Sequence, residues 1–293
     1  MGASEHYGNA EVRALHPCFG AAQNKGRIHL PVCPGCNIEC NFCDRKINDY
    51  EKRPGVAASI ISPQEAADVV NRAKALCPEI TVVGIAGPGD TLTSDKALET
   101  FALIDETHPD MIKCMSTNGL LLSERAQEVV DAGVKTLTVT VNAVDPEILS
   151  KIVSSIYYHG QRYIGTSAAK ILIRNQLEGI KKVSEAGITV KVNSVLISEI
   201  NREHIKDIAE TVSKYGAALY NIIPLIPQHK FSGLSEPGCP DIDGARREAE
   251  AYIDVFRHCQ RCRADAAGVP GKKDFAKELY EGKINAKETF SHG

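Results

Sequence analysis

The sequence predicts an α/β fold, a partial or complete (β/α) barrel of the TIM type. Six β-branched, apolar segments alternate along the chain with six amphipathic segments of helical period. Gly133 and Gly187 stand just past two of the helical segments, where a glycine favours the end of a helix. Such alternation is typical of repeated strand–helix units around a parallel sheet. An open doubly wound sheet is the alternative that six units allow.

Each element has its own signal. The expected strands are 27–33, 80–86, 111–117, 136–143, 189–197 and 219–226, and the expected helices are 63–76, 94–107, 123–132, 168–186, 202–215 and 244–258. Ser62-Pro63 and Ser123 are typical helix starts, because a serine oxygen can accept from the first turn and proline fits there. The flanks divide the chain into an N-terminal extension (1–26), a barrel core (27–258) and a C-terminal tail (259–293). We expect both extensions to cross the mouth of the barrel.

Composition excludes several classes of function. The chain has 293 residues and a net charge of -3, so no broad basic field indicates binding to nucleic acid or to a membrane surface. Its first residues are polar and no apolar run is long enough to span a bilayer, so we expect a cytoplasmic protein without a signal peptide. Ten cysteines in such a chain indicate metal binding or catalysis rather than disulfides.

The most informative motif is a cysteine loop directly after the first expected strand. Cys36, Cys40 and Cys43 have the spacing C-x3-C-x2-C. A [4Fe–4S] cube takes one thiolate per iron, so three cysteines leave one iron open to a further ligand. An open iron favours an enzyme over an electron carrier. Zinc is the alternative, but a structural zinc site needs four ligands and usually shows paired C-x2-C motifs.

Polar residues follow the expected strands at the ends where (β/α) barrels place their active sites. A glycine-rich run after the second strand would let a ligand approach the backbone closely, although an ordinary turn has the same appearance. On the fourth and fifth strands, polar residues share one face by period-two alternation, and they either line a ligand cavity or form a satisfied polar layer. The candidate binding residues are Gly87, Asp90, Asn118, Thr140, Asn142 and Asn193.

Further potential cluster ligands lie far apart in the sequence. Taken alone, each has an ordinary explanation: a packing histidine, a buried core cysteine, or a C-x2-C pair that binds zinc or cycles between redox states. Together they supply four thiolates and one imidazole, enough for one or two further clusters. These residues are His16, Cys18, Cys114, Cys259 and Cys262. Cys33 is an outside candidate, whereas Cys77 is interpreted as packing and Cys239 as a loop cysteine.

The cysteine loop resembles that of the radical SAM superfamily, and Phe42 matches the usual aromatic residue before the last cysteine. The resemblance implies that Cys36, Cys40 and Cys43 hold the catalytic [4Fe–4S] cluster. S-adenosyl-L-methionine (SAM) would chelate the open iron, and one-electron reduction would cleave it to a 5′-deoxyadenosyl radical. The loop from Gly87 to Asp90 would then contact the methionine amino group.

The order of motifs over residues 14–270 further resembles the NifB proteins, radical SAM enzymes of nitrogenase cofactor assembly in nitrogen fixation. This similarity rests on His16–Phe19, Arg27–Leu30, the cysteine loop through Lys46, Arg53–Val56, Gly84–Asp90, Ser116–Leu120, Val141–Asp145, Lys191–Ile197, Asn221–Leu225 and Cys259–Asp265. It implies that two further [4Fe–4S] clusters are fused, with a SAM-derived carbide and an extra sulfur, into an eight-iron precursor. His16, Cys18, Cys114, Cys259 and Cys262 would hold these clusters. Implied partners are a cofactor carrier, a nitrogenase scaffold protein and an electron donor such as a ferredoxin.

Two departures from this family pattern bear on the site. Many relatives have another cysteine near position 49, where this chain has Asp49, so that residue, His16, Glu51 or Glu65 would have to replace it. We also expect a stand-alone form without the carrier-like domain that some relatives carry. Two other functions stay possible at this point: a different radical SAM enzyme with auxiliary clusters, and a non-catalytic iron–sulfur carrier.

Overall fold

The computed structural model describes residues 10–19, 24–44 and 46–280. Within this part, seven strands form one sheet in the order β10-β1-β3-β4-β5-β8-β9, in which all neighbours are parallel except β10 and β1. The strands are β1 (Gly26–His29), β3 (Ile80–Ile85), β4 (Ile112–Thr117), β5 (Thr136–Thr140), β8 (Thr189–Leu196), β9 (Leu219–Pro224) and β10 (Ala267–Gly268). The edge strands β9 and β10 do not pair with each other, so the sheet does not close and the barrel is partial. This confirms the predicted fold class.

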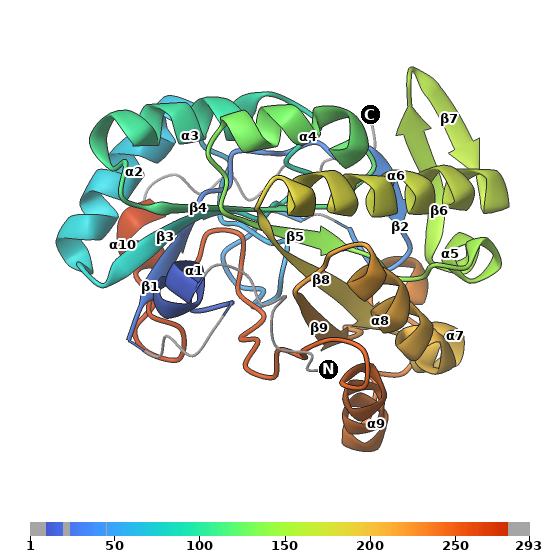
Figure 1. The fold of residues 1–293 in the computed structure, drawn as a ribbon. Helices are drawn as coiled ribbons and strands as arrows, with labels where there is room; N and C mark the ends of the chain where they lie inside the picture. Colours follow the sequence, from blue (N-terminus) through green and yellow to red (C-terminus); the bar gives the residue numbers. More distant parts are fainter. Residues whose placement is uncertain (1–9, 20–23, 45, 281–293) are drawn as a thin grey trace.

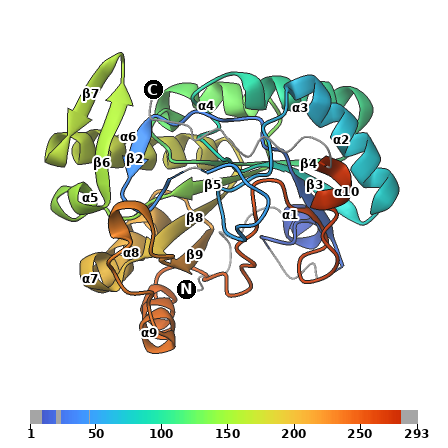
Figure 2. The same cartoon turned by 180° about the vertical axis from the view of Figure 1, so that it is seen from behind.

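The longer helices cover one side of this sheet. Figures 1 and 2 show α3, α4 and α6 on that side and α1 on the other, while α10 packs beside α2. The longer helices are α2 (Pro63–Leu76), α3 (Lys96–Thr107), α4 (Leu122–Asp131), α6 (Gly165–Glu185), α8 (Ile205–Lys214) and α9 (Cys239–Ala249). The short ones are α1 (Ala10–Leu15), α5 (Pro146–Ile152), α7 (Ser198–Asn201) and α10 (Ala276–Tyr280). None of the helices in the described ranges combines the length and apolar character needed to cross a membrane.

Strand residues alternate between a core face and a polar face. The first face packs under the helices in the main hydrophobic core, through Ile28, Val83, Ile85, Met115, Leu137, Val139, Val190, Val192, Tyr220 and Ile222. The opposite face, here called the inner face, carries the intervening residues, including Arg27, His29, Cys114, Thr136, Thr138, Lys191, Asn193 and Asn221. Period-two alternation therefore leaves the inner face polar over most of its width.

A second, three-stranded sheet was not predicted. It has the order β2-β6-β7, with β2 at Ile38–Cys40, β6 at Val153–Tyr158 and β7 at Gln161–Ile164. His159 and Gly160 join β6 to β7 with positive φ angles of 48° and 74°, which two-residue hairpins require. The histidine–glycine pair between two β-branched and aromatic runs was a usable hairpin signal. This sheet pairs the cysteine loop with a segment more than 100 residues away.

The expected helix 244–258 is wrong at both ends. The helix α9 begins at Cys239, after Gly238 and with Pro240 in its first turn, so Cys239 is a helix-start residue rather than a loop residue. It ends at Ala249 because the following chain pairs with the edge strand β9. Tyr220 donates its N–H to the Asp254 carbonyl at 2.8 Å, and Phe256 donates to the Tyr220 carbonyl at 2.7 Å. Tertiary hydrogen bonds thus override the local helical pattern. The other predicted strands and helices are confirmed within a few residues.

Candidate active site

The cysteine loop is anchored on its outer side by the second sheet. Ile38 pairs with Ile156 across β2 and β6, and the Asn37 carbonyl accepts the Tyr157 N–H at 2.7 Å. Farther along, Cys43 donates its N–H to the Cys40 carbonyl at 3.1 Å, which closes a turn. Cys36, Cys40 and Cys43 are all half-buried, and Cys36 and Cys40 pack against the smaller apolar core beneath the hairpin. Backbone bonds therefore fix the loop that carries the three half-buried cysteines.

On its inner side the loop is bonded to the turn after β3. Gly89 donates to the Cys33 carbonyl and Asp90 donates to the Gly35 carbonyl, each at 2.7 Å. Gly87, with φ 126°, lies in the same turn, and a β-carbon there would lie 3.6 Å from the Ala264 β-carbon. Cys33 itself is fully buried in the main core, and burial raises the pKa of its thiol to about 12. The structure therefore places Cys33 among packing residues.

Asp90 joins the ends of β3 and β4. Its carboxylate accepts the Asn118 backbone N–H at 2.5 Å, the Leu92 N–H at 3.0 Å and the Thr117 hydroxyl at 2.9 Å. The side chain is only 3% exposed, and burial raises its pKa although these donors act in the opposite direction. Contact of Asp90 with SAM stays a prediction, but its described contacts brace the turn.

The hydrogen bond from the Asn118 backbone to Asp90 places the Asn118 side chain next to the cysteine loop. Its Nδ2 donates to the Asn37 side-chain oxygen at 2.7 Å and lies 3.7 Å from the Cys36 Sγ. Its carbonyl accepts from the Gln176 side chain, which also donates to the Thr140 carbonyl, both at 2.8 Å. The sequence did not lead us to predict a role for Gln176. Its position as a polar residue on the buried face of the expected helix 168–186 was a possible signal of one. It holds the ends of β4 and β5 together.

The two remaining binding candidates lie on or beyond the inner face, where they bond to neighbouring strands. Asn142 is buried, and its side-chain oxygen accepts the Val195 N–H at 2.9 Å. Asn193 is half-buried and accepts from the Asn221 amide at 3.1 Å. Both contacts fit the polar layer that was the alternative interpretation. A direct role in SAM binding stays a prediction.

The structure brings the scattered cluster candidates together on the inner face. Cys262 accepts a hydrogen bond from the Arg27 guanidinium, with 2.9 Å between Nη2 and Sγ. Burial raises the pKa of Cys18, and the thiols of Cys262 and Cys259 lie close enough to raise it further. Burial likewise raises the pKa of Cys114 to about 11, with Cys18 a smaller contributor. Residues separated by up to 244 positions therefore share one electrostatic neighbourhood.

Lys191 lies at the centre of this group. Its Nζ donates to the Cys18 carbonyl at 3.2 Å and lies 4.6 Å from the Phe19 ring centroid and 5.4 Å from that of Phe256. The side chain is buried at 6% exposure. No carboxylate in the described part of the chain forms an ion pair with it. A buried ammonium held only by a carbonyl and two aromatic faces is an unusual arrangement that favours an anionic guest.

His16 is buried beside the same group, and burial holds its pKa well below the usual range. Its Nδ1 accepts the Cys18 backbone N–H at 3.1 Å, whereas Nε2 has no hydrogen-bond partner among the described residues. With Nδ1 accepting, the ring proton of the neutral imidazole lies on Nε2. In this geometry His16 offers an N–H donor, and iron coordination through Nε2 requires the ring to give up its bond to Cys18.

Arg263 links the C-terminal segment around Asp265 to residues 48–51, which follow the cysteine loop. It forms a two-point ion pair with Asp265, at 2.8 and 3.0 Å, and donates to the carbonyls of Asn48 and Glu51. Asp265 in turn accepts the Ala58 N–H at 2.6 Å. These bonds fix the position of Cys262 next to Arg27.

Of the four alternatives for the family's extra cysteine, the three acidic residues differ in their surroundings. Asp49 is exposed and lines the same pocket as Cys262. Glu51 accepts from Arg53 and Asn48, and Glu65 forms the capping box of α2 with Ser62. Glu65 therefore has a structural role at a helix start, whereas Asp49 lies beside the cluster candidates.

The donor set fits iron–sulfur clusters chemically. The cysteine loop supplies three soft thiols on a short, backbone-anchored segment, and Asn118 presents an amide toward one of them. His16 adds a buried nitrogen that has no partner among the described residues, and Lys191 and Arg27 add buried positive charge. In the described ranges, no three Cys, His, Asp or Glu side chains converge on a single metal position.

The half-barrel and its cysteine loop define a radical SAM protein, and the Radical SAM superfamily model matches residues 30–212. The "FeMo cofactor biosynthesis protein NifB" of Methanocaldococcus infernus is 47% identical over 276 residues, which cover 93% of this chain and 91% of that relative. The protein of the same name from Methanocaldococcus jannaschii is 46% identical over 278 residues, covering 94% and 92%. The chain belongs to the NifB family.

A longer relative agrees with this assignment, and solved structures agree with the fold. The NifB of Bradyrhizobium diazoefficiens is 41% identical over 267 residues, which cover 88% of this chain but 54% of that relative. Streptococcus suis SuiB bound to S-adenosylmethionine superposes with a TM-score of 0.59 at 12% identity, covering 82% of this chain and 52% of SuiB. A structure titled "Native anSMEcpe with bound AdoMet" gives 0.55 at 12% identity, covering 79% and 64%. At these identities, the two structures support the fold alone.

Proposed function

We propose that this protein is a radical SAM enzyme of FeMo cofactor biosynthesis that joins two [4Fe–4S] substrate clusters into an eight-iron precursor with a SAM-derived carbide and an added sulfur. The observation that carries the proposal is the gathering of Cys18, Cys114, Cys259 and Cys262 around Lys191 on the inner face. A radical SAM enzyme that carries only its SAM-binding cluster would not need this second group of thiols. The family relationship supplies the chemistry, and the second group supplies the support from this chain.

Cys36, Cys40 and Cys43 would hold the resident cluster, and SAM would bind between the turn 87–90 and Asn118. When bound, the cluster supplies the electron that cleaves SAM and generates the adenosyl radical. Asp90 fixes Asn118, and Gln176 fixes the ends of β4 and β5, so these residues position the SAM-facing surface. Gly87, Thr140, Asn142 and Asn193 are the further contacts proposed for SAM.

The second group of thiols would hold the substrate clusters, with His16 as an additional ligand or as an N–H donor to sulfide. Held there, a substrate cluster would accept the methyl group of one SAM on a sulfide, and hydrogen atoms would then be removed from that carbon. The buried cations Arg27 and Lys191 compensate the negative charge of thiolate-bound clusters. Residues 1–26, 27–258 and 259–293 act as an N-terminal ligand segment, a catalytic core and a C-terminal ligand segment. A ferredoxin-type donor, a carrier and a nitrogenase scaffold protein complete the proposed pathway.

Anaerobic reconstitution tests the proposal. Three cubes correspond to about twelve irons per chain, and a lone SAM-binding cluster corresponds to about four. The double variant Cys259→Ala/Cys262→Ala should lose auxiliary iron and still cleave SAM, while Cys77→Ala, a packing cysteine of the main core, should keep all of its iron. Adding SAM to the unchanged protein should give both S-adenosylhomocysteine and 5′-deoxyadenosine.

Each alternative function has its own outcome. Only 5′-deoxyadenosine would indicate a conventional hydrogen-abstracting radical SAM enzyme. Full iron without SAM cleavage would indicate a cluster carrier. Retention of all iron by the double variant would refute the auxiliary ligand assignment.

A further inference from the structure

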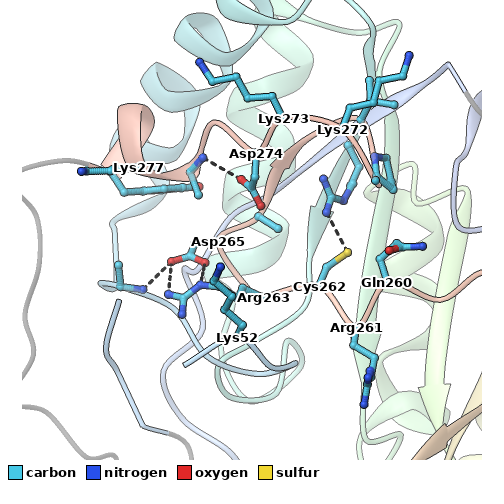
Figure 3. Close-up of a pocket in the computed structure, with 18 of the residues that line it drawn as sticks. Lys52, Gln260, Arg261, Cys262, Arg263, Asp265, Lys272, Lys273, Asp274 and Lys277 are labelled. Atoms are coloured by element: carbon cyan, nitrogen blue, oxygen red, sulfur yellow. Dashed lines mark hydrogen bonds and ion pairs between the residues drawn. The ribbon is translucent and has the colours of Figure 1, made fainter. Parts of the chain in front are cut away.

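A pocket of about 610 Å³ opens between the segment 49–58 and the C-terminal segment 260–280. Its lining includes seven lysine and arginine residues and three aspartates, on a chain whose net charge is -3. In Figure 3, Lys272, Lys273 and Lys277 lie above Asp265 and Cys262, while Lys52 and Arg261 lie below them. The pocket therefore concentrates positive charge where the whole molecule is negative.

The acids of the pocket do little to neutralise these cations. Asp265 is paired with Arg263, and Asp274 accepts the backbone N–H groups of Ala267 and Ala276. Lys273 pairs with Glu278 at 2.8 Å. Over the described ranges, no carboxylate lies within ion-pair distance of Lys52, Lys272 or Lys277, all of which are exposed. Lys272 donates to the Asn24 side chain at 3.2 Å, and none of the three exposed ammonium groups has an acidic partner among the described residues. They can therefore attract an anionic guest.

A thiol and a buried cation lie at the inner end of the pocket. Cys262 lines it, and the Arg27 guanidinium donates to the Cys262 sulfur at 2.9 Å. Arg27 is 4% exposed and is held by the Gly268 carbonyl at 2.8 Å, while its Nε has no partner in the described part of the chain. A phosphate would suit the basic walls equally well, but a thiol is a ligand for iron rather than for phosphate.

We propose that this pocket, here called the basic port, is the entrance through which an anionic iron–sulfur unit reaches Cys262; the proposal rests on the proposed function of the chain. Exposed lysines attract the unit, and the thiol at the inner end captures it. In the capture step the Cys262 sulfur forms a bond to iron and one capping thiolate leaves that iron. The departing thiolate takes the proton that Cys262 releases, so charge balances and no redox change occurs.

The test uses a background variant, Cys36→Ala/Cys40→Ala/Cys43→Ala, so that all iron acquired belongs to the auxiliary site. The probe is a synthetic [4Fe–4S] cube capped by four small thiolates, which carries a net charge of 2−. Stopped-flow absorbance under anaerobic conditions gives the rate of cluster acquisition, and iron analysis after gel filtration gives the amount. Adding Lys52→Glu/Lys272→Glu/Lys277→Glu should slow acquisition about tenfold or more at low salt and flatten its dependence on ionic strength.

The matched control reverses three exposed lysines outside the port, Lys135→Glu/Lys170→Glu/Lys206→Glu, and should change the rate less than about twofold because it alters only the net charge. If both triple variants slowed cluster acquisition equally, the proposal of a basic port would be refuted. An unchanged rate and salt dependence in the port variant would refute it as well. A background protein that acquires no iron at all would overturn the auxiliary site and the port together. Failure of the port alone is thereby distinguished from failure of the proposed function.

Discussion

A β-carbon on Gly89 would lie 1.9 Å from the carbonyl oxygen of Gly35, well inside any van der Waals contact. The two glycines belong to the two segments that meet at the surface proposed to bind SAM, the turn after β3 and the start of the cysteine loop. The N–H of Gly89 also donates to the neighbouring Cys33 carbonyl at 2.7 Å. The absence of a side chain at position 89 is therefore what lets the two backbones bond directly.

Gly89→Ala should separate these segments. Overpacking of this kind costs about 1–3 kcal/mol, so the variant should unfold at lower urea concentration and retain less iron on the cysteine loop. The matched control is Gly233→Ala, since a β-carbon on Gly233 meets no atom within 4 Å. Equal unfolding midpoints for the two alanine variants would contradict the steric argument.

Lys191→Met should separate stability from function. In the metal-free protein, the change removes a buried ammonium without an acidic partner and places a thioether between Phe19 and Phe256. The melting temperature should rise by roughly 2–6 °C. The same variant should hold auxiliary clusters less tightly, measured as faster loss of iron to a chelator. A lower melting temperature together with unchanged iron retention would show that Lys191 serves the fold alone.

His29 should make the metal-free protein sensitive to mild acid. Burial and the neighbouring Arg27 lower its pKa from 6.5 to about 4, against the smaller opposing effect of the Arg263 carbonyl and Asp265. The unfolded chain therefore takes up a proton at higher pH than the folded chain. The resulting stability is complete above pH 6.5 and is lost as the pH falls from 6.5 toward 4.

The loss over this range should be about 1–3 kcal/mol, measured by urea unfolding at a series of pH values. His29→Gln keeps a donor for the Arg263 carbonyl but cannot titrate. The difference in unfolding free energy between the unchanged protein and this variant should therefore shrink with acidification. A difference that is constant from pH 7 to pH 4.5 would be evidence against a shifted histidine.

Arg263→Lys should loosen the C-terminal segment without removing its charge. A lysine cannot reproduce the two-point pair with Asp265 together with the bonds to the Asn48 and Glu51 carbonyls, so stability should fall by about 2 kcal/mol. Hydrogen exchange should accelerate in residues 259–266. Arg202→Lys, which breaks a two-point pair with Glu248 elsewhere, should leave that segment unchanged.

Features of the fold could be predicted from the sequence where neighbouring residues determine them. The helix α2 begins at Pro63 and ends at Leu76 as predicted, because Ser62 and Glu65 form a capping box and Pro63 follows the cap. The cysteine loop could be recognised for the same reason, since its three thiols lie within eight residues. The end of α9 could not be predicted, because it depends on the pairing of residues 254–256 with β9.

Long-range contacts account for what the sequence did not reveal about the site. Arg27 and Cys262 are 235 residues apart, and Gln176 is 58 residues from Asn118. No spacing rule connects such pairs, and each becomes visible only when the sheet places their segments side by side. The grouping of His16, Cys18, Cys114, Cys259 and Cys262 was predicted because both extensions can cross the mouth of the barrel, and the family resemblance implied which clusters they hold. Their role as ligands stays a prediction.

The three-stranded sheet has a consequence for loading a cluster onto the cysteine loop. Strand pairing of residues 38–40 and the backbone bonds of Asn37, Asn41 and Cys43 tie the loop to the rest of the chain. We therefore expect a chain stripped of iron to keep this pairing, so that reloading requires iron and sulfide but no refolding of the loop.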